Sequence, residues 1–177
     1  YADTSWYNSS ETAFTLTDAA DLAGLAKLVN DGTANFQNKT VKLGNNIDLS
    51  GHAWAPIGGG GAMSNGMPVS GTPAFQGTFD GQGYTISGLS INPGAYGDGF
   101  GGFGLFGVVQ GGTISNVTVE GAISFTNDVS AVGGIVGYTT GNISGVVNKV
   151  NVTVNNPDVS NTGGVAGVIE NTGNEAG

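Results

Sequence analysis

The sequence contains no cysteine and no arginine, and only four of its 177 residues are lysines. Without cysteine there is no disulfide, no thiolate metal site and no cysteine nucleophile. The net charge of −9 excludes the dense cationic surface that nucleic-acid binding needs, and it disfavours binding to anionic lipid. No apolar run approaches the ~18 residues of a membrane-spanning helix. We therefore expect neither nucleic-acid binding nor membrane insertion.

Charged residues make up only 10% of the chain, whereas glycine contributes 34 residues, far above its usual share of about 7%. The glycines lack the three-residue period of collagen, and the 38% of apolar residues is enough for a core. The surface must therefore consist mostly of Asn, Ser, Thr and Gly.

One segment has the periodicity of an amphipathic helix, over about residues 18–30. Its apolar positions i, i+3, i+4 and i+7 are Leu22, Leu25, Ala26 and Val29. Thr17 or Asp18 is suited to the N-cap, and the segment 30–32 ends the helix. We expect this helix to cover the N-terminal end of a stack of strands, because repeat arrays usually have capping elements.

Short β-branched runs separated by turns follow from residue 38, with two glycine-rich loops at 54–75 and 96–102. The segment 75–92 reads as a strand, a tight Asp80-Gly81 turn and a second strand. Five aromatic residues lie in or next to the two loops, and we expect Phe75 and Phe103 to pack into the core. Trp54 and Tyr96 are left as candidates for binding a sugar or a protein, since function concentrates on loops. The remaining aromatic residue of the five is Phe100.

A Gly-x-x-Gly pattern recurs three times, with its first glycines 30 residues apart. Each of the first two copies precedes two strand-like runs, at 113–119 and 122–125, then at 142–147 and 149–154. A fixed period of this size predicts a solenoid, and runs this short and β-branched predict the coils of a parallel β-helix. The glycines would lie at its corners, where they permit positive φ and close backbone approach, and the apolar pair between them would direct one residue inward. These glycines are Gly104, Gly107, Gly134, Gly137, Gly164 and Gly167.

The fold class expected is an all-β solenoid, a right-handed parallel β-helix with one N-terminal capping α-helix. It forms one continuous domain, in which residues 1–103 hold the cap and first coils and residues 104–177 hold the repeats. The third repeat lacks its second half, and the chain starts at Tyr1. We therefore expect it to be a piece of a longer protein, with export signal, surface anchor and flanking domains outside this segment.

These motifs resemble the GLUG repeat family of bacterial surface proteins, whose name matches Gly104-Leu105-Phe106-Gly107. Further matching segments cover nearly the whole chain: DTSWY at 3–7, DLAGLA at 21–26, VKL at 41–43 running to IDL at 47–49, WAPIG at 54–58 and GTFDGQGYTI at 77–86. In repeats two and three, Ile135 and Val165 replace the leucine. The resemblance implies export, a β-helix, and membership of adhesin-like proteins or immunoglobulin A1 protease-like metallopeptidases.

Few residues of this sequence could form a catalytic site. His52 is the single histidine, so an HExxH zinc site cannot form, and no G-x-S-x-G elbow accompanies it. Two facing carboxylates could serve a glycosidase, although Asp80 suits a turn and Asp48 a strand end. A Thr ladder for ice binding is not expected, because Thr118 and Thr153 are out of register. The carboxylate candidates, which are too scattered to predict a calcium site, are Asp48, Asp80, Asp98, Asp128, Glu120 and Glu170.

We therefore expect no enzymatic activity, no cofactor and no metal. The sequence favours a stiff spacer or ligand-presenting module at the bacterial cell surface, with host or cell-surface glycans or proteins as partners. The alternatives are an accessory region of an exported immunoglobulin A1 protease-like metallopeptidase and a carbohydrate-active β-helix enzyme.

Overall fold

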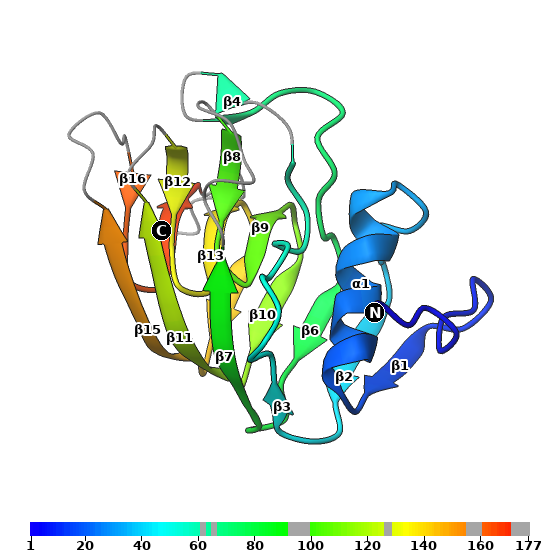
Figure 1. The fold of residues 1–177 in the computed structure, drawn as a ribbon. Coiled ribbons are helices and arrows are strands. Elements are labelled where there is room, and N and C mark those ends of the chain that lie inside the picture. The colour runs from blue at the N-terminus through cyan, green and yellow to red at the C-terminus, as the bar shows by residue number, and fades with distance from the viewer. Residues whose placement is uncertain (61–62, 65–66, 92–99, 126–128, 155–160, 171–177) are drawn as a thin grey trace.

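The chain folds into a β-solenoid of about four turns with one short helix (Figure 1). The computed structural model describes residues 1–60, 63–64, 67–91, 100–125, 129–154 and 161–170. Strands from successive coils pair in parallel, so the sequence-based expectation of stacked parallel coils is confirmed.

The helix α1 spans Ala19–Asn30 and follows the first strand, β1 (Ala13–Leu16). The Asp18 side chain accepts a hydrogen bond from the Asp21 backbone N–H at 2.9 Å, and the Asp21 carboxylate accepts one from the Thr17 N–H at 2.9 Å. The first bond satisfies a donor that a helix start otherwise leaves unpaired, and the second ties the residue before the N-cap to the first turn. The expected apolar face is confirmed, because all four of its residues are buried: Leu22, Leu25, Ala26 and Val29.

Four parallel sheets form the sides of the coil. The first sheet contains β1, β2 (Thr40–Leu43), β6 (Thr78–Asp80), β10 (Thr113–Ser115) and β14 (Asn142–Ser144) in that order. The second contains β3 (Ile47–Asp48), β7 (Thr85–Ile91), β11 (Thr118–Phe125) and β15 (Val147–Val154). The third contains β8 (Phe100–Phe103), β12 (Val129–Val132) and β16 (Asn161–Thr162), and the fourth contains β9 (Phe106–Val109), β13 (Val136–Thr139) and β17 (Ala166–Ile169).

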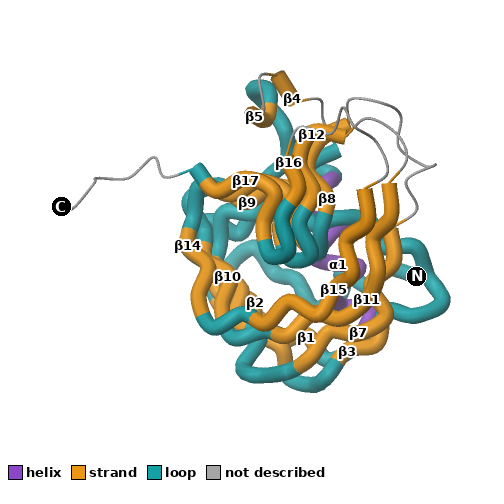
Figure 2. The backbone as a smooth tube through the Cα atoms, turned by 90° about the vertical axis from the view of Figure 1, so that its left-hand side faces the viewer, coloured by secondary structure: helices purple, strands orange, loops and turns teal. Residues whose placement is uncertain are grey.

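The register places equivalent side chains of successive coils in rows. In the first sheet, one inward row runs through Phe14, Val41, Phe79, Ile114 and Ile143. Figure 2 looks along the stack and shows the sheets around the interior, with α1 inside the outline of the coils. The rows give one continuous core in place of separate layers.

Three expected turns take a different form. The Asp80-Gly81 segment does not close a hairpin, because β6 and β7 belong to different sheets and the chain turns a corner there. The left-handed residues of this corner are Gln82 and Gly83, with φ of 52° and 81°. The later corners lie at Asn116 and Gly145, so the expected breaks near residues 120 and 148 are wrong, and β11 and β15 run through them.

The first glycine-rich loop is an insertion into one coil. Ile57 and Phe75 form isolated parallel bridges to the two ends of β9, Phe106 and Val109. The residues between them leave the coil and carry a short antiparallel pair, β4 (Met63–Ser64) and β5 (Met67–Pro68). Met63 packs against a small cluster, separate from the main core, that Ala74 forms with Val108 and Tyr138 of the fourth sheet. The insertion therefore shields apolar side chains of β9 and β13 from water.

Aromatic rings connect the N-terminal segment to the coils. Ring centroids lie 5.8 Å apart for Phe14 and Phe36, 6.0 Å for Phe36 and Phe75, and 5.3 Å for Phe75 and Phe106. Phe75 and Phe103 are buried, as expected. Large buried rings contribute strongly to core stability, so this row joins β1, the helix–strand connection and the later coils into one unit.

Candidate functional site

The repeated glycines lie where the third and fourth sheets turn into each other. Gly104 and Leu105 form the bend between β8 and β9, whereas Gly107 lies inside β9. The same holds for the second and third copies, so only the first glycine of each pair is at a corner. None of these six described glycines has a positive φ, which corrects one of the two expected reasons for them.

Close backbone approach, the other expected reason, accounts for these glycines with the exception of Gly164. A Cβ atom at Gly137 would lie 2.5 Å from the Phe103 nitrogen and 2.6 Å from the Gly102 Cα. A Cβ atom at Gly107 would lie 2.8 Å from the Gly102 carbonyl oxygen. Since real Cβ atoms keep much longer distances, β8 can lie this close to β9 and β13 only where side chains are missing.

The bends stack on one another through backbone hydrogen bonds. The Phe106 N–H donates to the Ile135 carbonyl at 2.8 Å, and the Ile135 N–H donates to the Val165 carbonyl at 3.0 Å. Leu105, Phe106, Ile135 and Val136 are all fully buried. In the first two copies both residues of the apolar pair therefore enter the core, and not one as expected.

Trp54 and Ile57 continue this stack of bends on the N-terminal side of Leu105. Its indole Nε1 donates to the Leu105 carbonyl at 3.0 Å, and the Ile57 N–H donates to the same oxygen at 3.0 Å. Only 4% of Trp54 is exposed. The structure thus places Trp54 in the core and not on the open surface that the expected ligand-binding role requires. Tyr96, the other candidate, lies outside the described residues.

The candidate carboxylates hold local structure. Asp48 accepts the Ser50 N–H at 2.9 Å, and hydrogen bonds from Ser50 lower the pKa of its carboxyl. Asp80 accepts the Gln82 N–H at 2.9 Å, which is the turn chemistry expected of it. Asp98 and Asp128 lie outside the described residues.

The other ionisable candidates are also engaged. Glu120 lies 3.8 Å from the Lys149 ammonium, and the His52 ring stacks on Tyr1 with centroids 4.0 Å apart. Tyr138 donates a hydrogen bond to Glu170, and burial together with this carboxylate raises the pKa of Tyr138 to about 12. Over the described part of the chain, no three His, Asp or Glu side chains gather into a group that could hold a metal ion.

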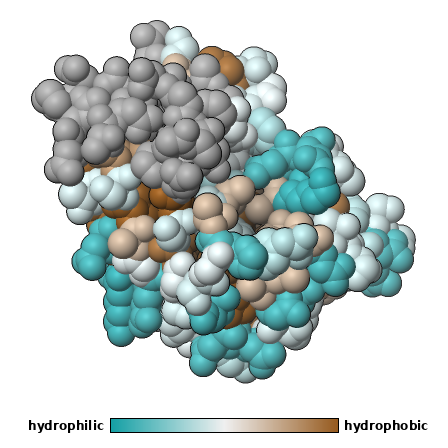
Figure 3. Space-filling model, viewed as in Figure 1, coloured by the Kyte–Doolittle hydropathy of each residue, from teal (hydrophilic) through white to brown (hydrophobic). Residues whose placement is uncertain are grey.

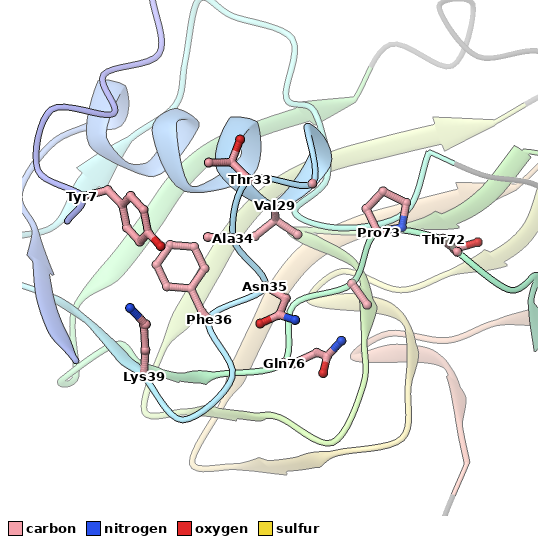
Figure 4. Close-up of a pocket in the computed structure, with 13 residues that line it drawn as sticks. Tyr7, Val29, Thr33, Ala34, Asn35, Phe36, Lys39, Thr72, Pro73 and Gln76 are labelled. Carbon is pink, nitrogen blue, oxygen red and sulfur yellow. The ribbon is translucent and has the colours of Figure 1, made fainter. Parts of the chain in front are cut away.

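A polar hollow runs along one side of the coils. Its first part has a volume of about 470 Å³ and lies between Tyr7, the segment 32–36 and the segment 71–76 (Figure 4). A second part of about 400 Å³ shares Lys39 and Gln76 with it and continues over the corners that precede β2, β6 and β10. Sequence reasoning missed this site, because its residues carry no motif and come from three coils.

The fold defines the class of protein, a parallel β-solenoid, and comparisons with known proteins add two relatives. The chain is 34% identical over 170 residues to halomucin of Haloquadratum walsbyi, covering 94% of this chain and 2% of halomucin. It is 28% identical over 149 residues to a putative Gly-rich membrane protein of Evansella cellulosilytica, covering 82% of this chain and 15% of that protein. No family model and no solved structure matches. None of the described helices has the length and apolar character needed to cross a membrane.

Proposed function

We propose that this chain is a non-catalytic β-solenoid module of a large repetitive cell-surface protein, where it acts as a stiff spacer that presents ligand-binding surface or a neighbouring domain. The observation that carries the proposal is the similarity to halomucin over 94% of the chain. The chain spans a small part of both relatives, so the activity of the whole protein belongs to this proposal. The GLUG resemblance supports the same assignment.

The physical properties of the fold support a spacer. Parallel strands joined along the whole stack resist bending, and the core is continuous from one coil to the next. The outward side chains of β11 and β15 are mostly polar, and Figure 3 shows hydrophilic surface at the lower left of this face, where these strands lie. Such a surface suits a segment that remains in water.

The proposal includes a right-handed coil and a capping role for α1. Right-handed connections between parallel strands are favoured by the twist of the strands. A cap is supported by the position of α1 directly after β1, the outermost strand of the first sheet, and by the burial of its apolar face. A helix in that place would shield the strand edges that aggregation requires.

Antibodies raised against residues 1–177 test the location. We expect them to label intact cells that make the parent protein, and mild protease treatment of those cells should remove the signal. A cytoplasmic protein serves as the control, which should be labelled only after permeabilisation. Labelling that also requires permeabilisation would reject the surface location.

A further inference from the structure

We propose that the polar hollow, lined by Tyr7, Asn35, Lys39, Gln76, Thr78 and Thr113, binds a neutral oligosaccharide in an extended conformation. We call these six residues and the space between them the polar groove. The inference goes beyond the proposed function and does not depend on it, because the groove is a property of this chain wherever the parent protein is located.

The shape of the groove follows from three stacked corners. The Thr78 N–H donates to the Lys39 carbonyl at 3.0 Å, and the Thr113 N–H donates to the Gly77 carbonyl at 3.0 Å. Gly77 and Gly112 line the hollow at equivalent places in these corners. A Cβ atom there would lie 2.5 Å from the Phe36 carbonyl oxygen and 2.4 Å from the Gly77 carbonyl oxygen, respectively, so the missing side chains let the corners stack closely. Successive coils are separated by ~4.8 Å, close to the length of one sugar unit in an extended chain. A linear oligosaccharide can therefore present one unit to each coil.

The lining offers uncharged groups that both donate and accept hydrogen bonds. Thr78 and Thr113 are paired across β6 and β10, so their side chains lie on the same side of the sheet. Neither hydroxyl, nor the side-chain amide of Gln76, makes a hydrogen bond to another described residue. Figure 4 shows Asn35 and Gln76 side by side, as expected from the 2.8 Å hydrogen bond of the Gln76 N–H to the Asn35 carbonyl. Neutral side chains that line one space in this way can form hydrogen bonds with the hydroxyl groups of a sugar.

An aromatic ring closes one end of the groove. Tyr7 is half-buried, and its ring packs 5.5 Å from Phe14 and 5.5 Å from Phe36, measured between centroids. Its hydroxyl has no hydrogen-bond partner among the described residues. A fixed ring with a free hydroxyl offers both an apolar surface and a polar group, which suits the mixed character of a sugar.

The charge of the groove selects against acidic glycans. Lys39 is its single cation, and its ammonium already donates to the Ser9 carbonyl at 2.7 Å and the Glu11 carbonyl at 2.9 Å. The same ammonium lies 5.5 Å from the centre of the Tyr7 ring. Because the whole chain carries a net charge of −9, a polyanionic chain would also be repelled at long range. The ligand class is therefore a neutral sugar chain.

Isothermal titration calorimetry with hexasaccharides tests this inference. The probes are neutral hexamers of glucose, mannose, xylose and N-acetylglucosamine, with a galacturonic acid hexamer as the acidic comparison. We expect saturable binding of at least one neutral hexamer and none of the acidic one. Thr78→Val, Thr113→Val and Gln76→Ala should each weaken binding about 3- to 10-fold, as expected for one lost neutral hydrogen bond.

Thr118→Val is the matched control. Thr118 is a half-buried residue of β11 outside the groove, and its register partner in the next coil is Val147, so the row already accepts valine. This variant should bind like the unmodified chain. In the unmodified chain, the neutral hexamer should shift the amide resonances of Gly77 and Gly112, a readout that needs no variant.

The inference is overturned if no neutral hexamer binds at millimolar concentration or if the acidic hexamer binds as well as the neutral ones. It is also overturned if Thr118→Val weakens binding as much as the groove variants do. Should a groove variant unfold, the amide shifts decide: changes confined to residues outside the groove reject the site. Absence of surface labelling would reject the proposed function and leave this result unaffected.

Discussion

Replacing Gly137 by alanine tests the close approach between β8 and β13. The added methyl group would lie 2.5 Å from the Phe103 nitrogen, 2.6 Å from the Gly102 Cα and 2.7 Å from the Gly102 carbonyl carbon. All three are backbone atoms, so no flexible side chain can move aside. A comfortable carbon contact needs about 3.5–4.0 Å, and the strands must separate by roughly 1 Å to provide it.

The expected cost follows from this displacement. Overpacking a core costs about 1–3 kcal/mol, and we expect the upper end here because two strands must move together. A loss of about 3 kcal/mol lowers the Tm by about 6–12 °C for a chain of this size. Urea unfolding followed by circular dichroism, together with a thermal scan, measures both quantities.

Gly164→Ala is the control for this experiment. Gly164 is the first glycine of the third copy of the same repeat, and the atom nearest to the methyl group that alanine would add is the Asn148 Nδ2 at 3.5 Å, an ordinary contact. We expect its stability to change by less than about 0.5 kcal/mol. Equal stability of the Gly137→Ala and Gly164→Ala variants would refute the close-approach explanation.

Three further predictions concern buried side chains. Trp54→Phe removes the donor to the Leu105 carbonyl and leaves a small void, so urea unfolding should show a loss of about 1–3 kcal/mol; unchanged stability would mean that the indole does not hold the bend. Leu25→Asp places an unpaired charge at a fully buried position and should cause aggregation in light scattering, whereas a stable monomer would contradict the capping role. The pKa of Tyr138 is raised from 10.0 to about 12. The contribution of the protonated Tyr138 to the free energy of unfolding is therefore complete below pH 10 and is lost as the pH rises through about 12. Unfolding midpoints measured from pH 9 to pH 12 should therefore fall more for the unmodified chain than for Tyr138→Phe, and parallel curves would reject this coupling.

The helix and the stacking of coils could be predicted from the sequence because both depend on local periodicity. Leu22, Leu25 and Val29 recur at helical spacing, and Asp18 is a favourable N-cap, so no distant contact is needed to define α1. The 30-residue period likewise predicts that equivalent segments lie side by side, as the pairing of Phe106 with Val136 confirms.

The corners were harder to predict because they depend on single residues. Asn116 turns the chain with φ of 53°, a conformation that asparagine tolerates but that no pattern announces. The sequence instead suggested a break near Gly121, whose φ of 153° the strand accommodates. A glycine can thus interrupt a strand pattern without ending the strand.

The burial of Trp54 and the polar groove were missed for a related reason. A tryptophan in a glycine-rich loop suggests an exposed ring, but the hydrogen bond of Trp54 to the Leu105 carbonyl spans two distant segments. The polar groove gathers Lys39, Gln76 and Thr113 from three coils, and no sequence spacing links them. Sites of this kind become visible only when the register between coils is known.

The insertion between Ile57 and Phe75 has a consequence for how such proteins diversify. Its two ends pair with Phe106 and Val109, which are only three positions apart in the neighbouring strand. The coil therefore closes in the same way whatever the length of the inserted segment, and the register of the coils that follow does not depend on it. Evolution can lengthen, shorten or replace such a segment and so change what the solenoid presents to its surroundings, while the number and order of its coils stay the same.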